Sequence, residues 1–143
     1  MAFSGARALS ATVQTISDWT TVSFSGTRYD TGPFWSAAQP TRLTVPAAGP
    51  YRVGHWLHSW LYSEDWTDLA SAVMVNGVTV ASANCTHRSL CLEPPLSFSV
   101  ALLLAAGDYV EVQGYADPRT TGRNHSARGY NTCLAEAWIA REG

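Results

Sequence analysis

Short segments of β-type composition, separated by glycine and proline turns, follow one another along this 143-residue chain. Thr, Val, Ile and aromatic residues dominate the segments, as in strands that pack against a core. The clearest signal is Asn76-Gly77, which separates the runs 71–76 and 78–82. A two-residue turn of this kind needs positive φ at both central positions and is typical of a β-hairpin. The pattern therefore predicts an all-β domain.

Further strands are expected on both sides of this hairpin. They cover 13–24 (with a break at Ser17-Asp18), 41–45, 51–62, 96–104, 109–115 and 130–140. Loops rich in polar and turn-forming residues are expected at 25–40, 84–95 and 116–129. About eight short strands at regular spacing are typical of a sandwich, a barrel or a jelly roll. The order of the strands does not follow from their spacing.

The segment Tyr51–Tyr62 is the longest predicted strand and the most aromatic. Alternation places Tyr51, Val53, His55 and Leu57 on one face and Trp56, His58, Trp60 and Tyr62 on the other. A single small sandwich covers only one face of such a strand, so the second apolar face indicates a subunit interface. The candidate residues for this interface, or for the core, are Tyr51, Trp56, His58, Trp60 and Tyr62.

Composition and charge exclude several classes of protein. Charged residues make up 14% of the chain and the net charge is −2, which argues against disorder and against a basic surface for nucleic acid. No apolar run reaches the roughly 20 residues that span a membrane, and residues 1–15 lack the pattern of a signal peptide. We therefore expect synthesis in the cytoplasm, no membrane insertion and no nucleic-acid partner.

The residues that carry chemistry show no pattern of an active site or a metal site. His55 and His58 are three apart on a predicted strand, so they point to opposite faces and cannot share one metal within a chain. The acidic group at 64, 65 and 68 is expected in a surface turn and lacks the spacing of a calcium loop. A Gly-x-Ser-x-Gly motif does not occur. We therefore predict a non-enzymatic domain with no cofactor or metal.

The three cysteines cannot all pair within the chain, because their number is odd. Buried free thiols are one possibility, and a disulfide between Cys85 and Cys91 is the other. The sequence leaves both open.

Several stretches in a fixed order carry a resemblance to a known family. They are Trp19–Phe24 (WTTVSF), Tyr29–Gly32 (YDTG), Arg42–Tyr51 (RLTVPAAGPY), Val75–Gly77 (VNG) and Leu104–Val112 (LAAGDYVEV). Together they resemble the globular head of complement C1q, which belongs to the tumour necrosis factor-like jelly rolls. The leading segment Gln14–Ile16 is more similar to bacterial and bacteriophage members. The resemblance implies a jelly-roll β-sandwich that forms a homotrimer, packed along a threefold axis by aromatic and apolar side chains.

The expected function follows from this resemblance and from what the chain lacks. Residues 1–11 are expected to form an N-terminal arm and residues 12–143 the jelly-roll domain. No collagen-like stalk or heptad coil precedes the domain, which favours a short knob over a long fibre. We expect a virion structural protein that decorates a phage capsid or forms a short head or tail knob, with a capsid or tail protein as partner.

A carbohydrate- or receptor-binding, lectin-like module is the alternative, with a host surface glycan as ligand. An exposed aromatic ring beside polar donors is the usual basis for stacking on a sugar. The candidate ligand-binding residues in predicted loops are Trp66, Arg119, Arg123 and His125. The remaining tryptophans, Trp19, Trp35, Trp56, Trp60 and Trp138, are expected to pack in the core or an interface.

Overall fold

The computed structural model describes residues 3–10, 14–16, 18–92, 95–116 and 132–143, with the side chains of 15, 59–67, 85–92, 95 and 132–133 left out of the description. Every regular element in these ranges is a strand. The strands are β1 Gly5–Leu9, β2 Gln14–Thr15, β3 Thr20–Thr21, β4 Gly26–Asp30, β5 Leu43–Thr44, β6 Gly49–Val75, β7 Val78–Leu92, β8 Pro95–Leu104, β9 Tyr109–Ala116 and β10 Thr132–Arg141. The all-β prediction is confirmed. No helix in the described ranges is long and apolar enough to cross a membrane.

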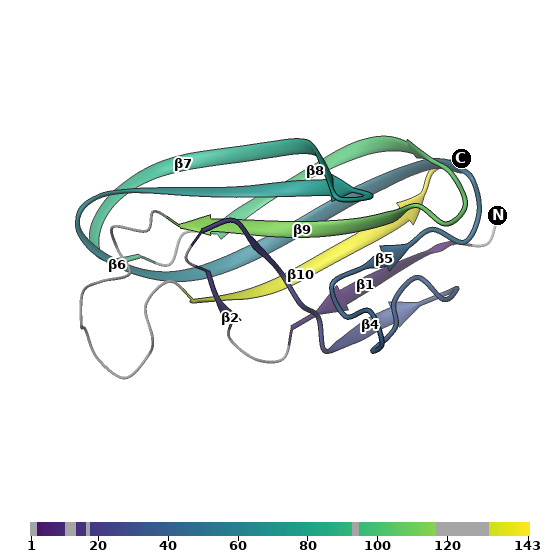
Figure 1. Ribbon diagram of the computed structural model, residues 1–143, viewed down its shortest axis with the longest axis horizontal. Helices are drawn as coiled ribbons and strands as arrows, with labels where there is room; N and C mark the ends of the chain where they lie inside the picture. The colour runs from purple at the N-terminus through teal and green to yellow at the C-terminus, as the bar shows by residue number, and fades with distance from the viewer. Residues whose placement is uncertain (1–2, 11–13, 17, 93–94, 117–131) are drawn as a thin grey trace.

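The strands form two antiparallel sheets that face each other (Figure 1). Sheet A has the order β4-β1-β10-β6-β8, and the short β2 also pairs with β10. In sheet B, β6 lies between β7 and β9, and β3 and β5 pair with the other edge of β9. The long strand β6 belongs to both sheets, because it pairs in sheet A up to Trp60 and in sheet B from Leu61 onward. This shared strand joins the two layers at one end of the sandwich.

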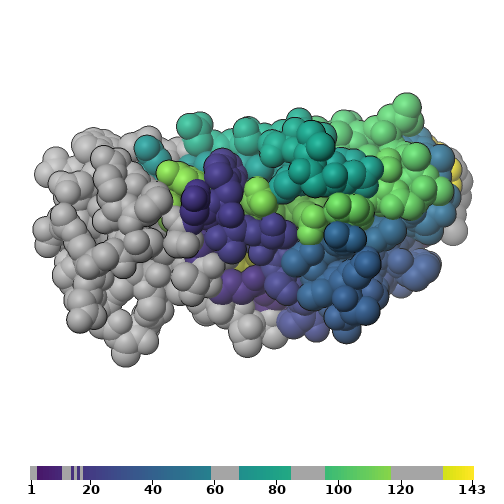
Figure 2. Space-filling view, in the orientation of Figure 1, coloured from purple at the N-terminus to yellow at the C-terminus, as the bar shows by residue number. Residues whose placement is uncertain are grey.

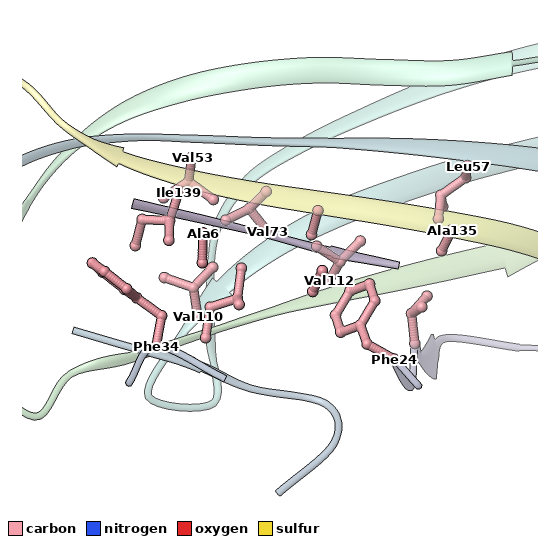
Figure 3. Packing of buried hydrophobic residues seen from close by; sticks show 14 of the residues in the cluster. Ala6, Phe24, Phe34, Val53, Leu57, Val73, Val110, Val112, Ala135 and Ile139 are labelled. Atoms are coloured by element: carbon pink, nitrogen blue, oxygen red, sulfur yellow. The ribbon is translucent and has the colours of Figure 1, made fainter. Parts of the chain in front are cut away.

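The core fills the space between the sheets, where alternate residues of facing strands meet (Figure 3). Sheet A contributes Val53, Leu57 and Ile139, and sheet B contributes Val73 and Val112. Burying aliphatic side chains of this size stabilises a fold by about 1.5–3 kcal/mol each. The period-2 alternation of these strands therefore determines which face of each sheet is inside.

Phe34 and Phe24, two aromatic residues outside the strands, complete the core, and Trp35 packs against it. Phe34 is 1% exposed and packs edge-to-face on Tyr51, with ring centroids 6.4 Å apart. The carboxylate of Asp30 accepts hydrogen bonds from the backbone N–H of Phe34 (3.3 Å) and of Trp35 (3.0 Å). Phe24 is 4% exposed, and Trp35 is half-buried against the same cluster. The predicted packing of Trp35 is confirmed.

The predicted hairpin at Asn76-Gly77 is confirmed, with φ values of 50° and 80°. The Asn76 side chain donates to the carboxylate of Asp108 (2.8 Å), which also accepts from the backbone N–H of Ala105 (2.8 Å). These two hydrogen bonds lower the pKa of Asp108. Asp108 therefore caps its turn and ties the 105–108 turn to the β6–β7 hairpin.

The predicted N-terminal arm is wrong for residues 5–9. These residues form β1, which lies between β10 and β4 in sheet A. Ala6 and Ala8 are fully buried. Glycine and alanine in this segment give only a weak strand signal in the sequence. In the structure, β10 and β4 pair with the two edges of β1 and satisfy its backbone hydrogen bonds. The domain therefore begins before residue 12.

Three predicted loops also differ from the structure. Residues 26–30 of the predicted loop 25–40 form β4, and most of the predicted loop 84–95 belongs to β7 and β8. The acidic group at 64–68 lies within β6 rather than in a turn. The segments around 64–68 and 84–92 pair with each other as parts of β6 and β7. Backbone hydrogen bonds between them therefore maintain strands in segments that lack an alternating apolar pattern. The predicted loop 116–129 lies outside the described residues from 117 onward.

Candidate functional site

The two faces of β6 in sheet A differ as the alternation predicts. Tyr51 and His55 are fully buried and point into the core, where the Tyr51 hydroxyl donates to the carbonyl of Ala47 (2.8 Å). Trp56 and His58 lie half-buried on the outer face, with their rings 5.4 Å apart. The side chains of Trp60 and Tyr62 lie outside the description. Of the predicted interface residues, Tyr51 is therefore core, and Trp56 and His58 lie on the surface that a partner would cover.

This outer face of sheet A contains a hollow of about 340 Å³. Four neighbouring strands, β1, β10, β6 and β8, supply its lining, which consists of Arg7, Trp56, Ser97, Glu136 and Trp138. The pairing of β6 with β10 places Trp56 opposite Glu136 and Gly54 opposite Trp138. The two indoles therefore come from neighbouring strands of the same sheet face.

Gly54 allows Trp138 to lie close against the sheet. A Cβ atom at position 54 would lie 2.1 Å from Cζ2 and 2.2 Å from Cε2 of the Trp138 ring. No side chain fits at that separation, so any other residue would displace the indole. Glycine at this position thus shapes the outer face of sheet A.

The carboxylate of Glu136 is paired with two arginines on this face. Arg28 donates to Oε1 from Nε (2.9 Å) and Nη2 (2.7 Å), and Arg7 donates to Oε2 from Nε (2.8 Å) and Nη2. Partial burial raises the pKa of Glu136, but the hydrogen bonds and charges of Arg28 and Arg7 outweigh it, so the pKa is lowered. Arg7 also lies 5.7 Å from the centre of the Trp138 ring, within the range of a cation–π contact. The negative charge of Glu136 beside the indoles is therefore paired, and the three side chains together are net positive.

The edge strand β8 adds small side chains to the same face. Ser97, Ser99 and Ala101 are exposed and alternate with residues that point into the core. Leu103, at the end of this row, is 84% exposed. The outer face of sheet A therefore combines two indoles, an ion-paired carboxylate and an edge strand with small side chains, which leave room for a second chain to approach the backbone.

Sequence reasoning missed Arg7 and Glu136 as members of this surface. The alternation of β10 shows that Glu136 and Trp138 share a face, but it does not show that Trp56 lies on the neighbouring strand. Arg7 was expected in the arm, and only the pairing of β1 with β10 brings it to Glu136. Residue contacts between segments this far apart have no local sequence signal.

Of the candidate ligand-binding residues, only the backbone of Trp66 is described, and it lies in β6, where it pairs with Arg88, rather than in the predicted loop. Arg119, Arg123 and His125 and the side chain of Trp66 lie outside the described residues, as do the side chains of all three cysteines. In the described part of the chain, no three His, Cys, Asp or Glu side chains gather as a metal site requires. Trp19 is 46% exposed, so of its two predicted places, core or interface, the core is excluded.

A buried histidine lies between the sheets. Nε2 of His55 is 2.8 Å from Oγ of Ser71, both residues are 0% exposed, and the imidazole meets the Phe98 ring edge-on at 4.5 Å. Burial lowers the pKa of His55 to about 4. The imidazole is therefore neutral near pH 7 and acts as a polar core residue that hydrogen-bonds across the sandwich.

Comparisons with known proteins identify the fold. No protein-family model matches the chain, and no curated protein matches it by sequence. The solved structure of the globular domain of zebrafish complement 1qA protein is similar, with a TM-score of 0.67, 15% identity and coverage of 99% of this chain and 98% of that one. Murine APRIL is similar as well, with a TM-score of 0.61, 17% identity and coverage of 99% and 100%.

This chain has the C1q/tumour necrosis factor-like jelly-roll fold. At this level of identity the similarity establishes the fold alone. The predicted jelly-roll β-sandwich is confirmed, and the similarity of structure covers 99% of the chain.

Proposed function

We propose that this jelly-roll domain is a non-enzymatic homotrimer that assembles through the outer face of sheet A and has an architectural role on the surface of a virion. The observation that carries the proposal is the pair Trp56 and Trp138, which borders a hollow on a sheet face that nothing in the chain's own described part covers. Half-buried aromatic residues of this kind are typical of the centre of a protein interface. The C1q resemblance implies a trimer packed by such side chains.

The charges of this face support burial in an interface. An isolated carboxylate would oppose association, because its desolvation costs several kcal/mol. Glu136 already has both oxygens engaged by Arg7 and Arg28. Docking of another chain therefore covers a carboxylate that is already ion-paired, together with the two indoles, while the side chains of Arg7 and Arg28 bring a net positive charge to the rim.

We predict that Ser99→Arg converts the trimer to a monomer without unfolding it. Ser99 is exposed and pairs with Gly54 beside Trp138, so arginine fits the isolated chain but places an unpaired charge in the interface. Sedimentation equilibrium should give the mass of three chains for the unmodified protein and of one chain for the variant. Thr79→Arg, exposed on β7 of sheet B, is the matched control and should remain trimeric. A trimeric Ser99→Arg protein would contradict the interface assignment.

The absence of an enzymatic role is supported by the position of the residues that catalysis could use. His55 and Ser71 have the types of a base and a nucleophile and lie within hydrogen-bond distance. Both are completely buried, however, and the imidazole is packed against Phe98. A substrate has no access to this pair, which forms one hydrogen bond between the sheets through Nε2 of His55, while Nδ1 has no partner among the described residues.

The placement on a virion is the finer part of the proposal and rests on the similarity of the N-terminal segment to bacteriophage members. We expect the protein to co-purify with particles, with a capsid or tail protein as its neighbour. Density-gradient fractions of a lysate, probed with an antibody against the chain, should contain it in the particle band. Recovery of the protein only from the free fraction would contradict a structural role on the virion.

A further inference from the structure

We propose a second, independent surface: a binding site for a neutral pyranose sugar on the outer face of sheet B, formed by Trp19, Tyr115, Ala70, Asp68, Ser82 and Asn84, which we call the sheet B groove. Its hollow has a volume of about 400 Å³, within the range of pockets that hold small ligands. It lies on the other sheet from the proposed trimer interface, so occupation of one surface leaves the other free.

Strand pairing explains why these residues meet. Ala70 of β6 pairs with Tyr115 of β9 on one side and with Asn84 of β7 on the other. Thr20 of β3 pairs with Gly114, which brings the preceding Trp19 beside Tyr115. Figure 2 shows the dark purple segment that leads into β3 lying against the green surface of β9 and below the teal of β7. The residues therefore form one row across the sheet.

The depth of the groove comes from Ala70. Neighbouring strands are about 4.8 Å apart, so Tyr115 and Asn84 lie on backbones about 10 Å apart with one strand between them. The methyl group of Ala70 is the floor, because it rises far less from the sheet than the side chains on either side. A width of this size suits a six-membered sugar ring lying between an aromatic wall and an amide.

The aromatic wall consists of two tilted rings, of which the indole of Trp19 is accessible. The rings of Trp19 and Tyr115 lie 5.3 Å apart at an angle of 36°, and Trp19 remains 46% exposed. An exposed tryptophan by itself is common on protein surfaces. Here it borders a hollow with polar groups on the opposite side, as a ring that stacks on the C–H face of a sugar requires.

The polar side of the groove matches the hydroxyl groups of a sugar. The amide of Asn84 and the hydroxyl of Ser82 can each donate to and accept from a sugar hydroxyl, and Asp68 borders the same side. All three residues are exposed. The described lining residues include no cation that could pair with the carboxylate or sulfate of a charged sugar. We therefore infer a neutral hexopyranoside as the ligand.

The test is a two-dimensional NMR titration of the full chain with the methyl pyranosides of glucose, galactose, mannose and N-acetylglucosamine. We expect saturable shifts with at least one of them and a Kd of about 1 mM, which corresponds to a standard binding free energy of about −4 kcal/mol. Trp19→Ala should weaken binding by about tenfold, because stacking on the indole is lost. Asn84→Ala should weaken it as well, because the amide that pairs with sugar hydroxyls is lost.

Two further variants keep the test decisive. Ala70→Leu fills the groove while all polar and aromatic groups remain, so it should abolish binding even if Trp19→Ala fails to fold. Tyr29→Ala is the matched control, because Tyr29 is 40% exposed in another aromatic pair, with Phe3, that lines no part of the groove. It should bind as the unmodified chain does.

The outcomes that would overturn the proposal are distinct from those that test the trimer. Absence of shifts with all four neutral pyranosides, equal binding by Ala70→Leu, or binding of sialic acid alone would each exclude the proposed site. Ser99→Arg, in contrast, should dissociate the trimer and leave sugar binding unchanged, because it lies on sheet A.

Discussion

Replacement of Phe34 by alanine should lower the free energy of unfolding by about 3–5 kcal/mol, the usual cost of truncating a buried aromatic side chain. Phe34 lies in a connection rather than in a strand, yet it is 1% exposed. Its ring fills the open edge between the sheets and contacts Tyr51 edge-to-face. The backbone around it is held by Asp30 and by a hydrogen bond from Thr44 N–H to its carbonyl (2.6 Å), so the cavity cannot close easily.

The matched control is Phe3→Ala. Phe3 makes a similar edge-to-face contact, with Tyr29 at 5.6 Å, but is 56% exposed. This change should cost about 1 kcal/mol or less. Urea unfolding of both variants at one protein concentration measures the difference. Equal losses for Phe3→Ala and Phe34→Ala would show that Phe34 is not a core residue.

Acidification from about pH 6.5 to about pH 4 should lower the free energy of unfolding by about 3 kcal/mol through His55 alone, at 1.36 kcal/mol for each pKa unit. In the folded chain burial lowers the pKa of His55 from 6.5 to about 4. Between these values the unfolded chain binds a proton that the folded chain does not, so stability falls as the pH falls. The contribution is fully present above about pH 6.5 and is lost at about pH 4 and below.

The measurement compares urea unfolding of the unmodified chain and of His55→Gln over this pH range. The variant has no imidazole at this position, so its stability should depend less on pH by the amount given above. Thr79→Gln, at an exposed position of β7 that carries no titratable group, is the control and should keep the pH dependence of the unmodified chain. Parallel profiles for the unmodified chain and His55→Gln would contradict a buried, neutral His55.

Local sequence patterns predicted the parts of the fold that depend on local geometry. The hairpin at Asn76-Gly77 could be read directly, because few residues other than Asn and Gly adopt positive φ without strain. The alternation along β6 correctly assigned His55 to one face and Trp56 to the other. The candidate interface was therefore half visible in the sequence, through Trp56 and His58.

The other half of the candidate sites depends on which strands are neighbours. Glu136 becomes a partner of Arg7 because β10 pairs with β1, and the two residues are 129 positions apart in the chain. Trp19 and Ala70 form one groove only because β9 separates β3 from β6 in sheet B. Spacing along the chain carries no signal for such pairings.

The sequence by itself thus determined an all-β domain, its principal turns and the inner face of its central strand. These follow from φ preferences and from period-2 burial, which act within a few residues. Only the tertiary structure decided that residues 5–9 form a strand between β10 and β4, that Phe34 belongs to the core and that Trp19 is exposed. The physical reason is that burial and backbone pairing depend on neighbours that are distant in the chain, and these can outweigh weak local preferences.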